Sequence, residues 1–395
     1  MREQLQEADK DSLRLEVLEG ELADEQNRYY AFLQTMKKTY PDFKSALEPT
    51  PQIDLLHLRQ QLAQRDAILL EYFWGEEALY LLSIESEHQQ IFKIEKNATL
   101  DQQLQGFLTY FQSPQAISND PQKYQQDAQD LAAILFPKNW RKDTSIQQLV
   151  LIPDGWLKYL PFEALVLSPN SDTPYLLHHF VSQYANSTAL YLSEKPETPW
   201  YQEALKVSPG FEKGQRGLSP LLHSQKELAH LARGIDLRTS AATFTAFKTH
   251  APQSKAIHLS THASANTAAQ NAQIEFYDQT IYLPQIYALD LSADLVVLST
   301  CESGMGKIEK GEGVISLGRA FRYAGAASVI ASLWKVNEAS TADIFAHFYQ
   351  TLQKGVGKAT ALRAAKLHYL ASAKSDLKRS PYYWSAFVYF GTNDP

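Results

Sequence analysis

Two stretches of the 395-residue chain decide its fold: Ala256-Ile-His-Leu-Ser-Thr-His262 and Leu295-Val-Val-Leu-Ser-Thr-Cys301. Each reads as a short strand that ends in a side chain able to carry acid–base or nucleophilic chemistry. Strands that are apolar almost throughout are typical of a mainly parallel sheet, because both faces of such a sheet are covered. Ligands of such sheets bind beyond the carboxyl ends of the strands. We therefore look for function at Cys301 and His262.

The sequence around these stretches alternates short apolar runs with helical patterns from residue 148 onward. The predicted strands are 149–152, 205–207, 256–260, 295–300, 327–334 and 385–390, and the predicted helices are 224–233, 312–324, 338–353 and 357–373. The helix at 224 opens on Ser224-Gln-Lys-Glu227, a capping-box signature. This alternation predicts an α/β fold with a mainly parallel sheet flanked by helices on both faces.

The N-terminal part of the chain has a different texture. Residues 1–47 carry apolar residues at alternating steps of three and four, which predicts a helix with one narrow apolar seam. Because this helix starts without a visible cap, we expect residues 1–50 to be the end of a helical-repeat array. Residues 51–144 predict a small α+β connector, with a short helix at 53–64, a β-meander at 67–74, 77–84 and 90–94, and helices at 99–112 and 121–136. Residues 145–395 then form the main domain.

Composition excludes several classes of protein. The single cysteine rules out an intrachain disulfide and a cysteine-based zinc site. A net charge of −7 provides no basic field for nucleic acid or for a membrane surface. The longest weakly polar run, 324–334, is far shorter than the roughly 20 residues of a membrane helix, and the N-terminus lacks a signal-peptide core. We expect a cytoplasmic protein without cofactor or metal.

The lone cysteine has two interpretations. A free cysteine usually behaves as a small buried hydrophobe. Cys301, however, comes after its apolar run and precedes the polar Glu302-Ser303-Gly304. A neighbouring histidine can lower the pKa of a thiol from about 8.5 and so supply the thiolate nucleophile. His262 lies past its strand end in a polar segment, whereas His258 lies within the strand and is expected to be a satisfied core residue.

The segment after Cys301, residues 302–313, contains four glycines and no strong helical or strand pattern. A phosphate-binding loop is disfavoured, because the glycine spacing does not fit that motif and the acidic residues would repel phosphate. A mobile loop beside the nucleophile and a plain surface connection both remain open.

Several ordered motifs within 145–395 resemble the CHAT domain family. Around the cysteine they are Leu298-Ser-Thr-Cys301-Glu-Ser-Gly304, Gly311-Glu-Gly-Val314, Arg319-Ala-Phe321, Ala324-Gly-Ala326, Ala331-Ser-Leu-Trp334 and Tyr383-Trp384-Ser-Ala-Phe-Val388. Upstream, the family's opening strand and turn resemble Ile152-Pro-Asp-Gly155 and Leu160-Pro-Phe-Glu-Ala-Leu165, and its histidine strand resembles Ile257-His-Leu-Ser-Thr-His262. CHAT proteins are caspase-like cysteine peptidases related to separase, and they usually follow tetratricopeptide repeats.

The resemblance implies a caspase-like sheet and a catalytic dyad. Cys301 would be the nucleophile and His262 its base and leaving-group acid. The backbone N–H groups of Cys301 and Ala263 would form the oxyanion hole. Ala263 departs from the family's usual glycine, and alanine would be strained there if the donor needs a positive φ. Milder departures are Thr300 and Ser303, where the family usually has alanine and threonine.

The resemblance also suggests a substrate groove beside the sheet, where an extended peptide would add as a strand. Trp334 would wall this groove, unless it is an ordinary core tryptophan, and Ser299 would also contact the substrate. Asp154 follows the first predicted strand, where the fold places a residue that selects the P1 side chain. A carboxylate would favour Arg or Lys there. Alternatively, Pro153-Asp154-Gly155 simply forms a turn.

Two functions from different classes follow. The first is an endopeptidase that cleaves selected protein substrates, switched on by a partner or an upstream tetratricopeptide sensor and belonging to a bacterial defence or signalling system. The second is a catalytically silent caspase-fold adaptor that mediates protein–protein contacts. Retention of both Cys301 and His262 favours the first, since an adaptor needs neither.

Overall fold

The structure, a computed structural model, describes residues 53–96, 98–192, 204–212, 214–231, 233–266, 271–300 and 313–391. The chain divides into two compact units, residues 1–53 and 54–395, and the description below concerns the second. The predicted N-terminal helix, the predicted nucleophile Cys301 and the glycine-rich segment 302–312 lie outside the described residues.

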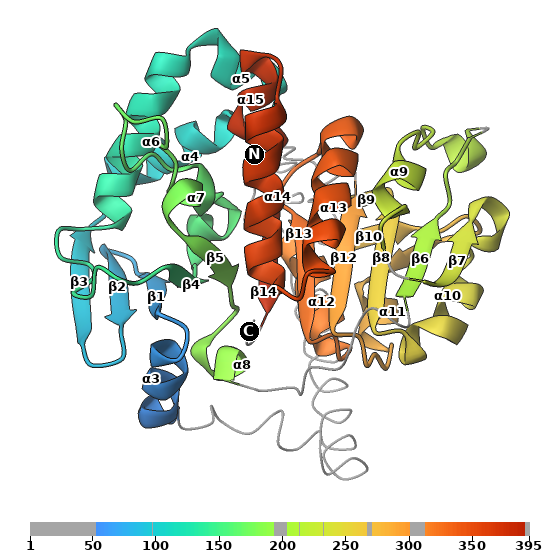
Figure 1. Cartoon of the computed structure of the whole chain (residues 1–395), viewed down its shortest axis with the longest axis horizontal. Coiled ribbons are helices and arrows are strands. Elements are labelled where there is room, and N and C mark those ends of the chain that lie inside the picture. The colour runs from blue at the N-terminus through green and yellow to red at the C-terminus, as the bar shows by residue number, and fades with distance from the viewer. Residues whose placement is uncertain are drawn as a thin grey trace, which may run out of the picture. The chain divides into compact units, whose positions relative to one another are not determined.

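One sheet of eleven strands runs through the described part of the second unit (Figure 1). Its order is β3-β2-β1-β4-β5-β14-β13-β12-β8-β6-β7. The strands are β1 (Ala67–Trp74), β2 (Ala78–Ile84), β3 (Gln89–Glu95), β4 (Gln148–Ile152), β5 (Val181–Tyr184), β6 (Ala204–Ser208), β7 (Gly234–Arg238), β8 (Ala256–Thr261), β12 (Leu295–Thr300), β13 (Ser328–Ser332) and β14 (Phe387–Gly391). A separate three-stranded antiparallel sheet contains β9 (Ala263–Asn266), β10 (Asn271–Glu275) and β11 (Thr280–Tyr282).

The large sheet consists of two parallel blocks that point in opposite directions. The first block consists of β1, β4, β5 and β14, which are parallel to one another. The second block consists of β13, β12, β8, β6 and β7, which are also parallel to one another. The blocks meet where β14 pairs antiparallel with β13. Their carboxyl ends therefore lie at opposite edges of the sheet, and each edge offers its own place for a ligand.

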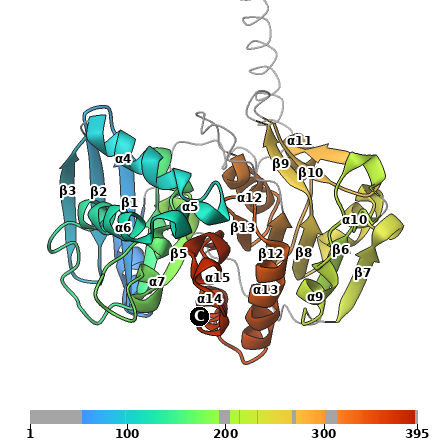
Figure 2. The ribbon, with the colours of Figure 1, turned by 90° about the horizontal axis from the view of Figure 1, so that it is seen from above.

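Helices cover both faces of the sheet (Figure 2). One face packs against α4 (Ala98–Thr109), α6 (Pro121–Leu135), α9 (Ser224–Leu228), α13 (Glu338–Leu352) and α14 (Lys358–Ser372). The other packs against α3 (Leu55–Ala63), α8 (Thr188–Leu192), α10 (Phe244–His250), α11 (Leu283–Tyr287), α12 (Gly313–Tyr323) and the small sheet. Shorter helices are α5 (Pro114–Asn119), α7 (Leu176–His179) and α15 (Asp376–Arg379).

Most of the predicted elements are confirmed. The β-meander 67–95 and the helices at 98–109, 121–135, 313–323, 338–352 and 358–372 match the patterns within a few residues. The meander, however, does not form a sheet of its own, because β1 pairs parallel with β4 and extends the main sheet. The strand predicted at 385–390 is antiparallel to β13, so the expected mainly parallel sheet has an internal reversal.

The predicted capping box at Ser224 is wrong. His223 is the N-cap of α9, no side chain caps it, and the helix ends at Leu228 rather than 233. The carboxylate of Glu227 turns into the core instead, where it contacts His258. A buried partner for the carboxylate thus outweighs the local cap.

Side chains of α14 tie β14 to the segment between β4 and β5. Lys366 is fully buried and its ammonium group contacts the Glu163 carboxylate and, at 2.6 Å, the carbonyl oxygen of Phe387 on β14. Arg363 donates to the carbonyl oxygens of Leu177 and His178 at 2.7 and 2.6 Å. One helix thereby connects the last strand of the sheet to the loops that precede β5.

Glu163→Gln tests the buried ion pair, because it leaves the Lys366 charge without its counter-charge. Breaking a buried pair typically costs about 3–5 kcal/mol of the free energy of unfolding. Replacing both partners with apolar residues, Glu163→Leu with Lys366→Met, should restore most of the loss. Denaturant unfolding measures both, with Glu95→Gln in the exposed Lys93–Glu95 pair as the control that should leave stability unchanged. A neutral Glu163→Gln variant would contradict the assignment.

His347 on α13 stacks on His368 of α14, with ring centroids 3.9 Å apart. Burial, then His368 and then Lys354, lower the pKa of His347. Between this lowered pKa and the ordinary value of about 6.5, the unfolded chain binds more protons than the folded one. Stability should therefore fall as the pH drops through that window. Urea unfolding between pH 5 and 8 should show a shallower pH dependence for His347→Gln than for wild type; an equal dependence would count against the stack.

Candidate functional site

The two stretches quoted at the outset lie side by side as predicted. β8 and β12 are parallel neighbours, and Thr261 is the register partner of Thr300. His262 comes directly after Thr261. Cys301 is joined to Thr300 by one peptide bond but lies outside the described residues, so no distance to His262 follows.

His262 is buried and one of its ring nitrogens is engaged. His262 is only 3% exposed, and its Nε2 lies 2.7 Å from the carbonyl oxygen of Ser219. A carbonyl oxygen only accepts, so Nε2 carries the proton that it donates. In the neutral ring, Nδ1 is then the nitrogen with a free lone pair. Within the described part of the chain, Nδ1 is buried and has no hydrogen-bond partner.

The loop after β6, residues 209–223, positions the ring. Gly210 and Phe211 both have a positive φ, +71° and +52°. A left-handed bulky residue such as Phe211 costs of order 1–3 kcal/mol, and such strain is common at functional sites. The turn brings the fully buried Phe211 ring to 5.4 Å from the His262 ring, so the imidazole is held between an aromatic wall and a carbonyl.

An ion pair fastens this loop to the small sheet. Arg216 Nη1 lies 2.8 Å from the Glu275 carboxylate and donates to the carbonyl oxygen of Phe276 at 2.8 Å. Glu275 in turn donates its backbone N–H to the carbonyl oxygen of His262 at 2.9 Å, and its own carbonyl accepts from the Thr261 hydroxyl. The segment that carries Ser219 and the strand end that carries His262 are thus tied to one residue of β10.

A cavity of about 350 Å³ opens beside His262. It lies at the carboxyl edge of the second parallel block, between the loop after β6 and the loop after β13. The Glu338 carboxylate joins these loops, because it accepts from the backbone N–H groups of Leu222 and His223 at 2.8 and 3.3 Å. The lining residues are Ser219, Leu222, His223, His262, Lys335, Val336, Asn337, Glu338 and Ala339.

His258 is the satisfied core residue that its position in the strand predicts. It is fully buried, with Nε2 2.5 Å from Glu227 Oε1 and Nδ1 2.5 Å from the Tyr349 hydroxyl oxygen. Ser260 donates to the other Glu227 oxygen at 3.1 Å. Burial first, and then the charge of Glu227, raise the pKa of Tyr349, which stays protonated. This network fixes α9 and α13 on β8 without facing the cavity.

Ala263 has no positive φ, so the substitution of the family's glycine causes no backbone strain. It pairs with Ile274 next to the hydrogen-bonded pair formed by His262 and Glu275. Bonded and non-bonded pairs alternate along an antiparallel ladder. The Ala263 N–H therefore points away from β10.

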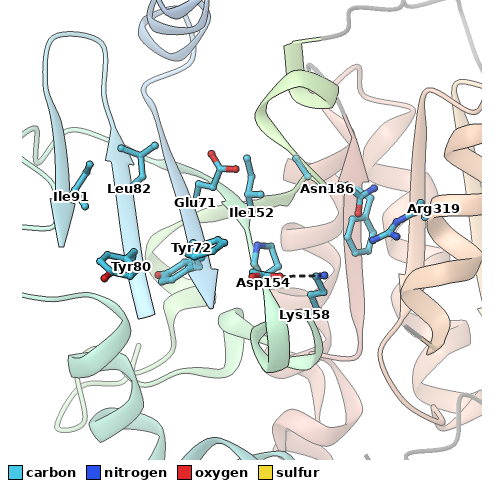
Figure 3. Close-up of a pocket in the computed structure, with 14 residues that line it drawn as sticks. Glu71, Tyr72, Tyr80, Leu82, Ile91, Ile152, Asp154, Lys158, Asn186 and Arg319 are labelled. Carbon is cyan, nitrogen blue, oxygen red and sulfur yellow. Dashed lines mark ion pairs between the residues drawn. The ribbon is translucent and has the colours of Figure 1, made fainter. Parts of the chain in front are cut away.

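None of the three predicted substrate-binding residues lines the cavity beside His262. Asp154 follows β4, whose carboxyl end lies at the opposite edge of the sheet, where it contacts Lys158 (Figure 3). Trp334 is 2% exposed, stacks on Phe111 and donates to the Tyr382 carbonyl oxygen at 3.1 Å, which is the core alternative. Ser299 is 3% exposed, within β12.

Sequence reasoning missed the Ser219 carbonyl oxygen and the Arg216–Glu275 ion pair. A carbonyl group leaves no trace in a sequence. The three glycines at 210, 214 and 217, directly after a buried strand, were the signal that could have marked the loop. Elsewhere in the described residues, no group of three or more His, Cys, Asp or Glu side chains could hold a metal ion, and no helix is long and apolar enough to cross a membrane.

The hydrogen bond to Ser219 makes a spectroscopic prediction. Neutral His262 should populate the tautomer protonated at Nε2, because the carbonyl oxygen requires a donor there. Two-bond ¹H–¹⁵N correlation spectra of the ¹⁵N-histidine-labelled chain, assigned with His262→Gln, should give a non-protonated ¹⁵N shift for Nδ1 at neutral pH. A protonated Nδ1 in the neutral ring would show that the ring is turned over.

Solved structures share the fold. Two crystal structures of the Saccharomyces cerevisiae separase–securin complex superpose on 85% of the chain with TM-scores of 0.52 and 0.53, at 9% and 10% identity. The matched part is 30% and 31% of the other chain. At this identity the likeness concerns the fold alone, and it supports the predicted caspase-like α/β architecture.

Curated relatives match a shorter stretch. Tetratricopeptide repeat protein 28 of Mus musculus is 35% identical over 106 residues, and its Homo sapiens counterpart is 34% identical over 105. Each match covers 27% of this chain and 4% of the relative, so the chain spans a small fraction of the length of these proteins.

The CHAT domain family matches residues 125–392, which contain both parallel blocks from β4 onward and the cavity beside His262. This range is more than half of the chain. The ordered motifs, the sheet and the family match agree, and the chain belongs to the CHAT domain family.

Proposed function

We propose that the chain is a cysteine endopeptidase with Cys301 as nucleophile and His262 as general base and acid. One observation carries the proposal: His262 has a buried Nδ1 lone pair without a partner among the described residues, at the end of β8. Thr300, the residue bonded to Cys301, is in register with Thr261, the residue before His262. Two neighbouring parallel strands therefore carry the two groups that thiol catalysis requires.

The reaction divides the roles as follows. Nδ1 of His262 accepts the Cys301 thiol proton, and the thiolate attacks the substrate carbonyl carbon. The imidazolium then donates that proton to the leaving amine as the C–N bond breaks, which leaves a thioester. A water molecule, deprotonated by the same Nδ1, hydrolyses the thioester and regenerates the thiol. The Ser219 carbonyl oxygen supports every step, because its hydrogen bond from Nε2–H becomes stronger when the ring is cationic.

The oxyanion would be stabilised by the backbone N–H groups of Ala263 and Cys301. The Ala263 amide points away from β10, which supports its availability. Each such donor is typically worth about 3 kcal/mol of transition-state stabilisation. Because the donors are backbone groups, alanine in place of glycine at 263 retains this function.

The substrate would be an extended protein segment at the carboxyl edge of the second block. Residues 335–339, rather than Trp334, would contact it, since they line the cavity beside His262. The names of the curated relatives refer to tetratricopeptide repeats, and in the solved neighbours separase is complexed with securin. These relationships support regulation by a repeat sensor or a partner protein. We propose that this regulation serves a defence or signalling role.

A thiol-reactive peptidyl acyloxymethyl ketone tests the proposal. Mass spectrometry should locate the adduct at Cys301, and Cys301→Ala should abolish it. His262→Ala should slow labelling by about 10²-fold or more, the usual contribution of a general base. His88→Ala, at an exposed histidine outside the cavity, is the matched control and should label at the wild-type rate.

The adaptor alternative predicts a different result. Its thiol would not be activated, so native Cys301 would react no faster than Cys301 in the urea-unfolded chain. That outcome, together with an unchanged labelling rate in His262→Ala, would contradict the peptidase proposal. The labelling is also repeated in a lysate of the native host, which supplies any activating partner. The two proposals are then compared for the chain both with and without that partner.

A further inference from the structure

A second cavity, of about 580 Å³, lies at the opposite edge of the sheet from His262. It opens at the carboxyl ends of β1 and β4, and the meander strands β2 and β3 extend it sideways (Figure 3). Because the two parallel blocks point in opposite directions, this edge is the ligand-binding edge of the first block. We call the cavity the β1–β4 groove. The proposed peptidase chemistry uses none of it.

A row of register partners forms the floor of the groove. Ile91 of β3 pairs with Leu82 of β2, Leu82 pairs with Glu71 of β1, and Glu71 pairs with Ile152 of β4. Neighbouring strands are about 4.8 Å apart, so these side chains follow one another across the sheet on one face. The floor is therefore apolar except for one carboxylate in its middle.

The meander end of the groove exposes large apolar side chains. Ile91 is 73% exposed and Phe73 63%, and the Phe73 ring lies 6.4 Å from that of Tyr80, its register partner. Single exposed apolar residues need no explanation, but three on adjacent strands around a cavity mark an interaction surface. The groove thus offers an apolar wall.

Glu71 is the feature that selects the occupant. Its carboxylate accepts one neutral hydrogen bond, 2.9 Å from the Thr188 hydroxyl, and no cation lies on it among the described ion pairs. Glu is depleted in strands, and a half-buried carboxylate pays for lost hydration unless a cation compensates it. A basic group from outside would supply that compensation, with the carboxylate as a charge-assisted acceptor.

The far end of the groove is polar. Asp154 and Lys158 form an ion pair at 3.4 Å, and the Asp154 carboxylate also accepts from the Trp74 backbone N–H at 3.0 Å. Figure 3 shows Asn186 and Arg319 beyond them. The groove therefore runs from an apolar wall through an acidic centre to a polar end that contains a basic residue.

We propose that the β1–β4 groove docks a segment of a partner protein in which one Arg or Lys side chain is flanked by apolar side chains. The apolar residues cover Phe73 and Ile91, and the basic side chain reaches Glu71. Charge complementarity favours this occupant over a lipid surface, because the centre of the groove is acidic and the chain carries −7 overall. A peptide is also long enough to contact both the apolar wall and the carboxylate.

Selection of a displayed library of random short peptides on the immobilised full chain tests this. Wild type should enrich peptides with Arg or Lys adjacent to Leu, Ile, Phe or Trp. Glu71→Lys should reverse the preference to Asp or Glu at the same position. A wild-type-selected peptide, synthesised with a fluorophore, should lose about tenfold or more in affinity for Glu71→Gln, the usual effect of removing a charge-assisted bond.

Glu76→Lys is the matched control, since it makes the same charge change at an exposed residue outside the groove. It should retain the wild-type selection, and all variants should share the wild-type Tm. The proposal is overturned if no peptide is enriched, if the enriched peptides lack a basic residue, or if Glu76→Lys changes selection as much as Glu71→Lys. It is also overturned if the chain dimerises through this surface, shown by a Glu71→Lys variant that is monomeric where wild type is dimeric. None of these outcomes depends on Cys301 or on peptidase activity.

Discussion

A single ammonium group, that of Lys366, ties β14 to the rest of the first parallel block. Backbone pairing of β14 with β5 is limited to one register pair, Phe390 opposite Tyr184. Lys366 compensates by contacting Glu163 of the first block and the Phe387 carbonyl oxygen of β14 at the same point. Burial lowers its pKa, while Glu163 opposes that shift. The charge is therefore tolerated only as long as β14 and the segment that carries Glu163 stay in place.

The surroundings of His262 are fixed by a chain of dependent contacts rather than by the strand alone. Arg216 and Glu275 fasten the loop after β6, the loop presents the Ser219 carbonyl oxygen, and the carbonyl determines which ring nitrogen carries the proton. The buried hydrogen bond between His258 and Glu227 also fixes the same strand, β8, to α9. The proposed general base is thus held in place by surrounding hydrogen bonds and ion pairs, as precise general base catalysis requires.

Sequence reasoning identified the strands because β8 and β12 are buried on both faces and lack the alternation of a half-exposed strand. It also distinguished His262 from His258 by position relative to the strand end. It could not detect the reversal at β14, since an apolar run carries no direction. Asp154 was expected in the substrate groove from the resemblance, and the reversal places it at the opposite edge of the sheet. The hydrogen bond between His262 and the Ser219 carbonyl oxygen and the buried contact of Glu227 with His258 could not be predicted either, because both depend on tertiary partners. A local cap signal at Ser224 was outweighed by a buried histidine.

The reversal at β13 and β14 gives this sheet two separate carboxyl edges. Molecules bound at the two carboxyl edges cannot compete for space, so a protein held at one edge leaves the other free to meet a second chain. Arg319, in the β1–β4 groove, belongs to α12, the helix that directly follows the segment 301–312. The two proposals together assign docking and peptide cleavage to opposite edges of one sheet, so that a protein docked at the β1–β4 groove would have a raised local concentration near His262.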